Sequence, residues 1–163
     1  MSKKFNESEL KSHEKMAKDC FNKTWDLLEK SERTEEEEIE MIHTAHASRY
    51  HWRVLVDNGK GGPLNLQRGE WQIARVYTVL KRAEPALFHA ERCLKITKKN
   101  NISDFDLGFA YEAMARAMAA AGEEKEFKKY YDLAEEAGKK IKDKGDKDYF
   151  FEDFNKGEWF GMK

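Results

Sequence analysis

The sequence predicts an all-α protein of antiparallel helix hairpins that stack on one another and end in a C-terminal capping helix. Apolar residues recur at positions i, i+3, i+4 and i+7 along the chain, which is the spacing of one helix face. Runs of β-branched residues, which are typical of strands, are missing. A two-helix unit also occurs twice, because the pattern around Ile73 returns around Met114, 41 residues later. We expect one domain, residues 1–163, with a core of its own.

An antiparallel pair of helices is expected within residues 6–57. The first helix is predicted over residues 7–30 and the second over residues 35–56, each with an apolar stripe. Thr34 starts the second helix, because Glu37 lies three residues later and completes a capping box. We interpret the four glutamates after Thr34 as part of this helix start, because carboxylates favour the positive end of the helix dipole. A metal site or a site for a basic partner is the alternative.

The glycine-rich stretch at residues 57–65 is the one clear loop. No strand precedes it and no GxxxxGK[ST] pattern follows, so it does not indicate a phosphate-binding loop. Its Asn-Gly and Gly-Pro pairs favour turns. Asn65 is expected to cap the next helix and Ser103 a later one. Two helix–turn–helix units are predicted over residues 66–99 and 103–142.

The two units can be aligned position by position at the 41-residue spacing. Apolar residues meet apolar residues on both sides of a turn, which is the pattern of two amphipathic helices packed as a hairpin. Small residues in mid-helix mark where a neighbouring helix must approach closely. The aligned pairs are Ile73 with Met114, Ala74 with Ala115, Tyr77 with Met118, Lys81 with Gly122, Ala86 with Phe127, Ala90 with Tyr131 and Cys93 with Ala134.

These residues resemble the tetratricopeptide (TPR) repeat, which places a large and a small apolar residue before an aromatic residue, then a turn and spaced small residues. Glu70 departs from the pattern where the first tryptophan belongs, and the period exceeds the ~34 residues of the family. The stretch from His46 to Ala113 is also similar to a group of bacterial TPR-like proteins with no assigned activity. The resemblance implies a short right-handed superhelix that acts as a non-catalytic protein-binding, peptide-binding or scaffold module.

The C-terminal segment, residues 146–163, is predicted to cap the stack. Phe150, Phe151 and Phe154 would cover the exposed apolar face of the second unit, because stacked repeats need such closure. The alternative is that the final stretch GEWFGMK is a mobile recognition peptide. In that case Trp159 would reach a groove of its own chain or of a neighbouring chain.

Composition narrows the classes of partner. The 30 basic and 31 acidic residues leave no field of a single sign that recruits nucleic acid or a membrane. No apolar run approaches the ~20 residues of a membrane span, and the first residues lack a signal-peptide core. Cys20 and Cys93 lack the spacing of metal ligands and are interpreted as small buried residues of a cytoplasmic protein. We expect a protein or peptide partner and no metal or cofactor, with self-association left open.

The resemblance implies that the first helix of each unit lines a concave surface, whose outward residues would bind the partner. These residues are Arg68, Trp71, Gln72, Arg75, Thr78, Phe109, Glu112 and Arg116. Arg75 aligns with Arg116, so stacking would bring two guanidinium groups together beside Trp71, which suits a carboxylate or phosphate on an apolar body. The simpler interpretation, which we favour, is a helix pair between Glu112 and Arg116 with a solvated Arg75. Closed internal salt bridges at both arginines would contradict the anion hypothesis.

A second candidate site lies in the helix predicted at residues 35–56. His43, His46 and Tyr50 share one face there and could belong to a metal-dependent or small-molecule enzyme or sensor. The interpretation we favour is that these side chains form hydrogen bonds between helices. No nucleophile with a nearby base is recognisable in the sequence, so we expect a protein that is not an enzyme.

Overall fold

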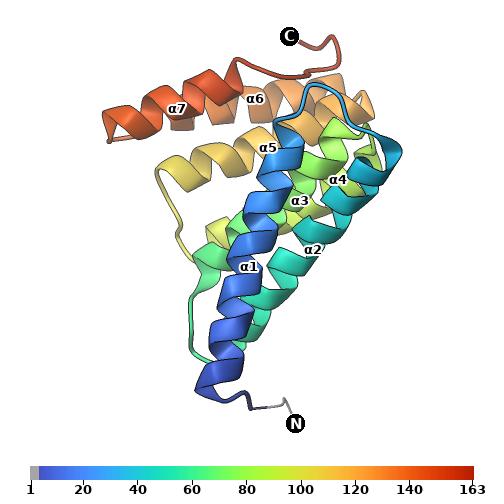
Figure 1. Cartoon of the computed structure of the whole chain (residues 1–163). Helices are drawn as coiled ribbons and strands as arrows, with labels where there is room; N and C mark the ends of the chain where they lie inside the picture. The colour runs from blue at the N-terminus through green and yellow to red at the C-terminus, as the bar shows by residue number, and fades with distance from the viewer. Residues whose placement is uncertain (1–3) are drawn as a thin grey trace.

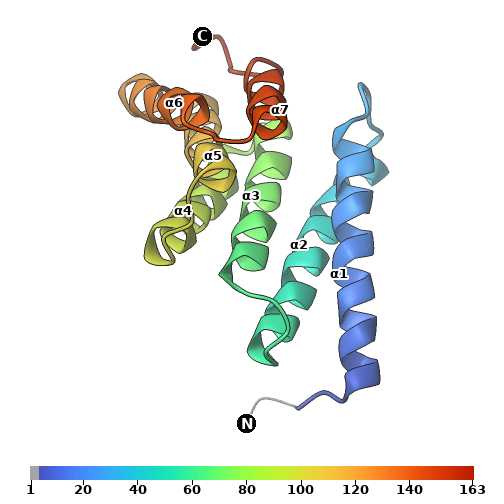
Figure 2. The same ribbon diagram turned by 90° about the vertical axis from the view of Figure 1, so that its left-hand side faces the viewer.

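The computed structural model describes residues 4–163, which form seven α-helices and no strand (Figure 1). This confirms the all-α fold class. Each helix packs against the next one along the chain, and α3 also packs against α5. Figure 2 places α3 between the α1–α2 pair and the group of α4, α5 and α6. The helices are α1 (Glu7–Leu28), α2 (Glu35–Asp57), α3 (Pro63–Val79), α4 (Ala83–Lys99), α5 (Phe105–Ala121), α6 (Glu124–Lys139) and α7 (Lys144–Phe154).

Side-chain caps fix the starts of the first two helices. The Oδ1 atom of Asn6 accepts a hydrogen bond from the amide of Glu9 at 2.9 Å, and the carboxylate of Glu9 accepts from the amide of Asn6 at 2.8 Å. Thr34 and Glu37 form the same reciprocal capping box, as the sequence predicted. Each box satisfies two amides that a helix N-terminus would otherwise leave without a partner.

The starts of α3 and α5 differ from the expectation. Asn65 lies inside the first turn of α3, where its Oδ1 atom accepts from the amide of Gly62 at 3.0 Å. The helix begins earlier because Pro63 occupies its first position, where a missing N–H costs nothing. Ser103 does not cap α5, which begins after Asp104 without a side-chain cap bond.

The ends of α3 and α5 support the alignment of the two units. Lys81 and Gly122 were aligned at the turn, and both adopt a left-handed backbone with φ of 58° and 74°. The next amide closes the helix in the same way in both units: Arg82 donates to the carbonyl of Tyr77 at 2.8 Å, and Glu123 donates to that of Met118 at 3.0 Å. These bonds are the 6→1 bonds of a Schellman motif. The first helices of the two units therefore end in the same way, as α2 and α4 also do through the amides of Lys60 and Ile102.

The core is centred on α5, which is covered on most sides. Ala74 and Ala115 are 1% and 0% exposed, as expected for alanines at close helix contacts, and their aligned neighbours Ile73 and Met114 are each 2% exposed. Ala74, Met114 and Ala115 belong to one apolar cluster with Trp71, Phe109, Phe127 and the C-terminal aromatics, whereas Ile73 belongs to a second cluster formed by α1, α2 and α3. Within the described residues, no helix is both long and apolar enough to cross a membrane.

The C-terminal segment covers the last hairpin. Phe150 and Phe154 of α7 are 0% and 1% exposed, and Trp159 is buried against Phe127, Tyr131 and Phe154. Gly138 of α6 lies directly beneath Phe150, where a Cβ atom would overlap the ring. These contacts favour the cap interpretation over a mobile recognition peptide.

Candidate functional site

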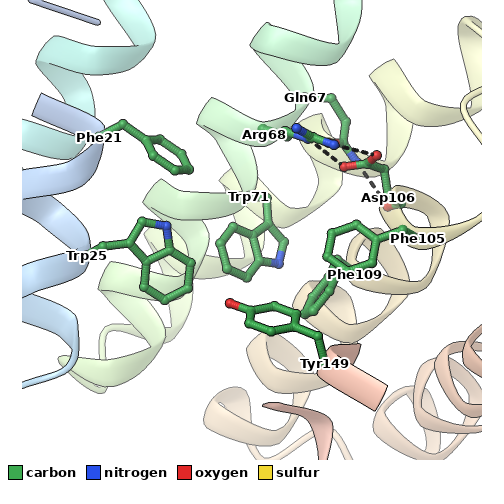
Figure 3. A pocket seen from close by; sticks show the side chains of 9 residues that line it. All are labelled: Phe21, Trp25, Gln67, Arg68, Trp71, Phe105, Asp106, Phe109 and Tyr149. Atoms are coloured by element: carbon green, nitrogen blue, oxygen red, sulfur yellow. Dashed lines mark hydrogen bonds and ion pairs between the residues drawn. The ribbon is translucent and has the colours of Figure 1, made fainter. Parts of the chain in front are cut away.

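A groove runs between α1 on one side and α3, α5 and α7 on the other. It consists of three adjoining hollows, of which the central one is mainly aromatic and has a volume of about 170 Å³. The neighbouring hollows join it because they share lining residues: Phe21 and Arg68 at one end, Trp25 and Tyr149 at the other. The central hollow is lined by Phe21, Trp25, Gln67, Arg68, Trp71, Phe105, Asp106, Phe109 and Tyr149 (Figure 3).

Helical spacing positions these side chains on facing walls. Phe21 and Trp25 are one turn apart on α1, and Arg68, Trp71 and Arg75 are each about one turn apart on α3. Residues at this spacing share a helix face, so each helix presents a row of side chains to the groove. The fold contributes the rest, since α5 and α7 add Phe109 and Tyr149 from distant parts of the sequence.

The aromatic rings contact one another in edge-to-face and tilted geometries. The ring centroids of Trp25 and Trp71 are 5.5 Å apart, and those of Trp71 and Phe109 are 5.4 Å apart at an interplanar angle of 76°. Such pairs are favourable because the positive edge of one ring meets the negative face of another. Trp71 and Phe109 form the deep wall, and Tyr149, which is 50% exposed, stands at the rim.

An ion pair at one end of the central hollow links α3 to α5. The guanidinium group of Arg68 donates two hydrogen bonds to the carboxylate of Asp106, at 2.8 and 3.0 Å. This pairing raises the pKa of Arg68 above its ordinary value, against the opposing effect of burial. Beneath it, the side-chain amide of Gln67 donates to the hydroxyl of Thr97 and to the carbonyl of Asp106. The polar groups at this end therefore hold the backbone of α5 in place.

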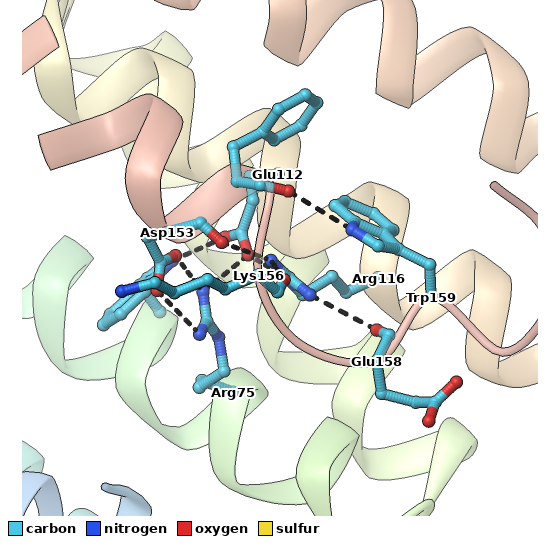
Figure 4. Close-up of polar contacts among 9 residues, drawn as sticks. Arg75, Glu112, Arg116, Asp153, Lys156, Glu158 and Trp159 are labelled. Atoms are coloured by element: carbon cyan, nitrogen blue, oxygen red, sulfur yellow. Dashed lines mark hydrogen bonds and ion pairs between the residues drawn. The ribbon is translucent and has the colours of Figure 1, made fainter. Parts of the chain in front are cut away.

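The carboxylate of Glu112 is completely buried and is the centre of a charge network behind the aromatic wall (Figure 4). One of its oxygens accepts from Arg75 at 2.6 Å and from Arg116, while the other accepts from the indole N–H of Trp71 at 3.1 Å. Asp153 of α7 binds Arg75 through both oxygens, at 2.6 and 3.2 Å. Two carboxylates thus face two guanidinium groups, which compensates the cost of burying them.

The protonation of this network follows from its pairing. Burial alone would raise the pKa of Asp153, but the charge and hydrogen bonds of Arg75 outweigh burial and hold that pKa below its ordinary value. For Arg75, burial opposes the charged form, and Glu112 with Asp153 still raises its pKa. Arg75 and Asp153 are therefore both charged at neutral pH.

Arg116 fastens the C-terminal segment to α5. Its guanidinium group donates to the backbone carbonyls of Asp153, Lys156 and Glu158, each at 3.1 or 3.2 Å. The same group lies 4.1 Å from the ring centroid of Trp159, which is within the range of a cation–π interaction. Through these contacts, Arg116 holds α7 and the residues after it against the last hairpin.

The network corrects the expectation of an open anion site. Arg75 and Arg116 do meet beside Trp71, but Glu112 and Asp153 neutralise them, and the side chain of Arg116 is only 3% exposed. The simpler interpretation is also wrong in part, since Arg75 is not solvated. The two arginines position the groove wall: they hold Trp71 from behind through Glu112, and they hold α7, which carries Tyr149.

The predicted groove residues divide into two groups. Arg68, Trp71 and Phe109 line the central hollow, and Arg75 lines the third one. Gln72 and Thr78 face the interior instead, at 0% and 3% exposed, as do Glu112 and Arg116. The side-chain amide of Gln72 donates to the carbonyl of Phe21, so it joins α3 to α1.

The histidine-rich face of α2 is divided in the structure. His43 and Tyr50 are exposed, whereas His46 is partly buried and its Nε2 atom lies 2.9 Å from the hydroxyl of Tyr77. His46 also packs edge-on against the ring of His89. No group of three or more potential ligands is placed to hold a metal ion among residues 4–163. The observed contacts of His46 are hydrogen-bonding and packing contacts between helices.

Glu70, which departs from the TPR pattern, is the centre of a second buried network. It is 2% exposed and accepts from Arg49 of α2 at 3.0 Å and from Arg92 of α4 at 3.1 Å. Its other oxygen lies 2.6 Å from Nδ1 of His89. Burial raises the pKa of Glu70, but His89, Arg92 and Arg49 outweigh burial and lower it. The residue therefore joins three consecutive helices through charge.

Most of the groove lining was not predicted from the sequence. Phe21 and Trp25 were not among the expected groove residues, yet they form the wall opposite Trp71. Tyr149 and Phe105 were likewise not predicted to line it. A signal was present for α1: Phe21, Trp25 and Leu28 follow helical spacing beside the buried stripe and give the helix a second apolar face.

The fold and the groove together define a class: an all-helical protein of stacked neighbouring helices with an aromatic groove between its first helix and the rest of the stack. Comparisons with protein-family models, with curated proteins and with solved structures found no match. The architecture is compatible with a helical repeat, and the function must be inferred from the groove.

Proposed function

We propose that the protein is a non-catalytic, TPR-like binding module whose groove between α1 and the helices α3, α5 and α7 takes a segment of a partner protein. The observation that carries the proposal is the central aromatic hollow. It is lined by six aromatic side chains from four helices, and Tyr149 at its rim remains half exposed. Aromatic surfaces of this kind are enriched at binding sites, because they contribute large apolar area at a low cost in side-chain entropy.

The shape of the groove suits an elongated ligand. The central hollow measures about 170 Å³, which suits one large apolar side chain, and the adjoining hollows of about 240 and 410 Å³ extend the contact along the chain that carries it. The helical hairpins that resemble TPR units support the same proposal. The two free cysteines support the proposed cytoplasmic location.

The proposal is tested by selection from a displayed library of random peptides against the purified protein. We expect enriched peptides to share a large apolar residue and to lose at least tenfold in affinity when Tyr149→Ala or Trp25→Ala opens the hollow. Tyr50→Ala is the matched control, because Tyr50 is 61% exposed and lies outside all three hollows. Circular dichroism establishes that each variant remains folded.

Two outcomes would overturn the proposal. One is a failure of selection to enrich any peptide. The other is an enriched peptide whose affinity falls with Tyr50→Ala but not with Tyr149→Ala, which would place the binding surface on the outer face of α2.

A further inference from the structure

Charged groups differ between the two ends of the groove. The hollow beyond Phe21 contains Lys18 and Arg68 and no carboxylate. The hollow beyond Tyr149 contains three carboxylates, those of Glu29, Glu152 and Asp153, against the two cations Arg75 and Lys156. The groove therefore has a basic end, an aromatic centre and an acidic end.

The difference between the two ends remains when only the charges that a ligand can reach are considered. At the acidic end, Arg75 and Asp153 are closed in the Glu112 network, so the accessible groups are Glu29, Glu152 and Lys156. Lys156 pairs with Glu152, but both side chains are more than 60% exposed, and an exposed helix pair of this kind is weak. At the basic end, Lys18 has a similarly exposed pair with Glu14, which does not line the groove. Arg68 keeps Asp106 as its own partner and is half exposed.

The length of the groove matches a short extended segment. Lys18, Phe21, Trp25 and Glu29 follow one another at about one turn of α1, so the three hollows lie along a span of ~16 Å. Alternate side chains on one face of an extended chain are ~6.6 Å apart, so three of them cover ~13 Å, which is close to this span.

We propose that the groove recognises a segment of a partner protein in extended conformation with opposite charges at its two ends. A carboxylate would bind at Lys18 and Arg68, a large apolar side chain in the central hollow against Trp25 and Trp71, and a lysine or arginine at Glu29 and Glu152. The distance along α1 from Lys18 to Glu29 is eleven residues, or ~16 Å, which corresponds to about five residues of extended chain. Complementary charge at the two ends sets the register of the segment, while the aromatic centre contributes most of the affinity. This inference rests on the proposed function of the groove.

The test uses four short peptides and the intrinsic fluorescence of the protein, whose four tryptophans include Trp25 and Trp71 of the central hollow and Trp52 of the basic end. The mixed-charge probe is acetyl-Asp-Ser-Phe-Ser-Lys-amide. Its comparators carry aspartate at both ends, lysine at both ends, or alanine in place of phenylalanine. We expect the mixed-charge probe to bind about fivefold more tightly than either single-sign probe at low salt, and this advantage to disappear at high salt. The alanine probe should bind weakest of all.

Charge-reversal variants of the protein test the inference more directly. Lys18→Glu should make the peptide with lysine at both ends the preferred ligand, and Glu29→Lys should make the peptide with aspartate at both ends preferred. Both side chains are exposed in the structure, so neither change disturbs the core. Lys139→Glu on α6 is the control, because it reverses an exposed charge outside the groove and should leave the order of affinities unchanged.

The outcomes separate this inference from the function on which it rests. Equal affinity for the three phenylalanine peptides, combined with loss of binding in Trp25→Ala, would overturn the charge preference and leave the groove as the binding site. Binding of none of the four peptides would overturn the charge preference too, while the library selection would still decide whether the groove binds a partner. Reversed preferences in the two charge-reversal variants would support the inference directly.

Discussion

Two buried glutamates organise the polar interior, and their surroundings differ. Glu70 joins α2, α3 and α4, which are consecutive in the chain, through Arg49, His89 and Arg92. Glu112 of α5 binds Arg75 and Trp71 of α3, which lie 37 and 41 residues before it in the chain. It also pairs with Arg116 of its own helix, which binds the C-terminal segment at Asp153, 37 residues later. The cations of the first network are partly open to solvent, with the side chain of Arg92 at 47% exposed, whereas Arg116 is 3% exposed.

The two networks are similar in composition, but their structural roles differ because different parts of the molecule lie next to them. Glu70 does not line any of the three hollows of the groove, and its network joins neighbouring hairpins. Trp71 stands between Glu112 and the aromatic hollow, and Asp153 holds the helix that carries Tyr149. The Glu112 network therefore positions the wall of the groove, and its failure should affect binding as well as stability.

The largest effect should follow removal of residues 146–163, which takes away the far side of the Glu112 network and leaves the Glu70 network intact. Phe150, Phe154 and Trp159 are each 5% exposed or less, and the loss of one such aromatic side chain typically costs ~3–5 kcal/mol. We expect aggregation in size-exclusion chromatography, or a melting temperature lower by about 10 °C or more by circular dichroism. An unchanged melting temperature would show that the segment is not a structural cap.

The next largest effect should distinguish the two glutamates directly. Glu112→Gln leaves two buried arginines with one carboxylate and should lower the free energy of unfolding by about 3–5 kcal/mol. Glu70→Gln should cost less, about 1–3 kcal/mol, because Arg92 can turn to solvent. Urea denaturation monitored by circular dichroism measures both. If the two substitutions lower the free energy of unfolding by the same amount, then the exposure of the partner cations does not determine the cost of losing the buried carboxylate.

Substitution of one arginine in each network by lysine tests the difference between the two networks further. Arg116→Lys keeps the charge but loses the planar group that reaches three backbone carbonyls and stacks on Trp159, so we expect a loss of about 2–3 kcal/mol. Arg92→Lys should change stability by no more than about 0.5 kcal/mol, because its side chain is half exposed. Affinity for groove peptides should fall only in Arg116→Lys, which a purely structural difference between the networks would not produce.

The smallest effect should be a dependence of stability on pH that arises from histidines outside the Glu112 network. Burial, followed by the charge of His89, lowers the pKa of His46 below its ordinary value of 6.5. The unfolded chain therefore binds more protons than the folded chain in this range, and stability should decrease as the pH falls below about 6.5. The pKa of His51 is lowered in the same direction by burial and by His13, so it contributes a similar slope.

Melting temperatures of the wild type and His46→Gln between pH 7.5 and 5.5 test this dependence. We expect the substitution to reduce the slope, and the double variant His46→Gln with His51→Gln to reduce it further. Arg75 and Asp153 keep their charges over this range, so neither of these two groups should add to the slope. A slope that is identical in all three proteins would exclude His46 and His51 as its origin.

Some features of the fold could be predicted because they depend on residues close in sequence. Thr34 and Glu37 specify a helix start within one turn, and the alignment of Lys81 with Gly122 identified two equivalent helix ends. Only four of the eight predicted groove residues line the groove, among them Trp71 and Phe109. Helical periodicity gives the side of a helix, but which neighbour covers that side depends on distant packing.

The helices, the capping box of Thr34 and Glu37, the two hairpins and the apolar stripes follow from the sequence alone, because hydrogen bonding and periodicity within a helix are local. The tertiary structure alone decided that Arg75 and Arg116 are closed by Asp153 and by carbonyls of the C-terminal segment. It also decided that Trp25 and Tyr149 meet Trp71 around one hollow. The physical reason is that a buried charge must be paired and an aromatic face must be covered, and the groups that satisfy both needs come from helices far apart in the chain.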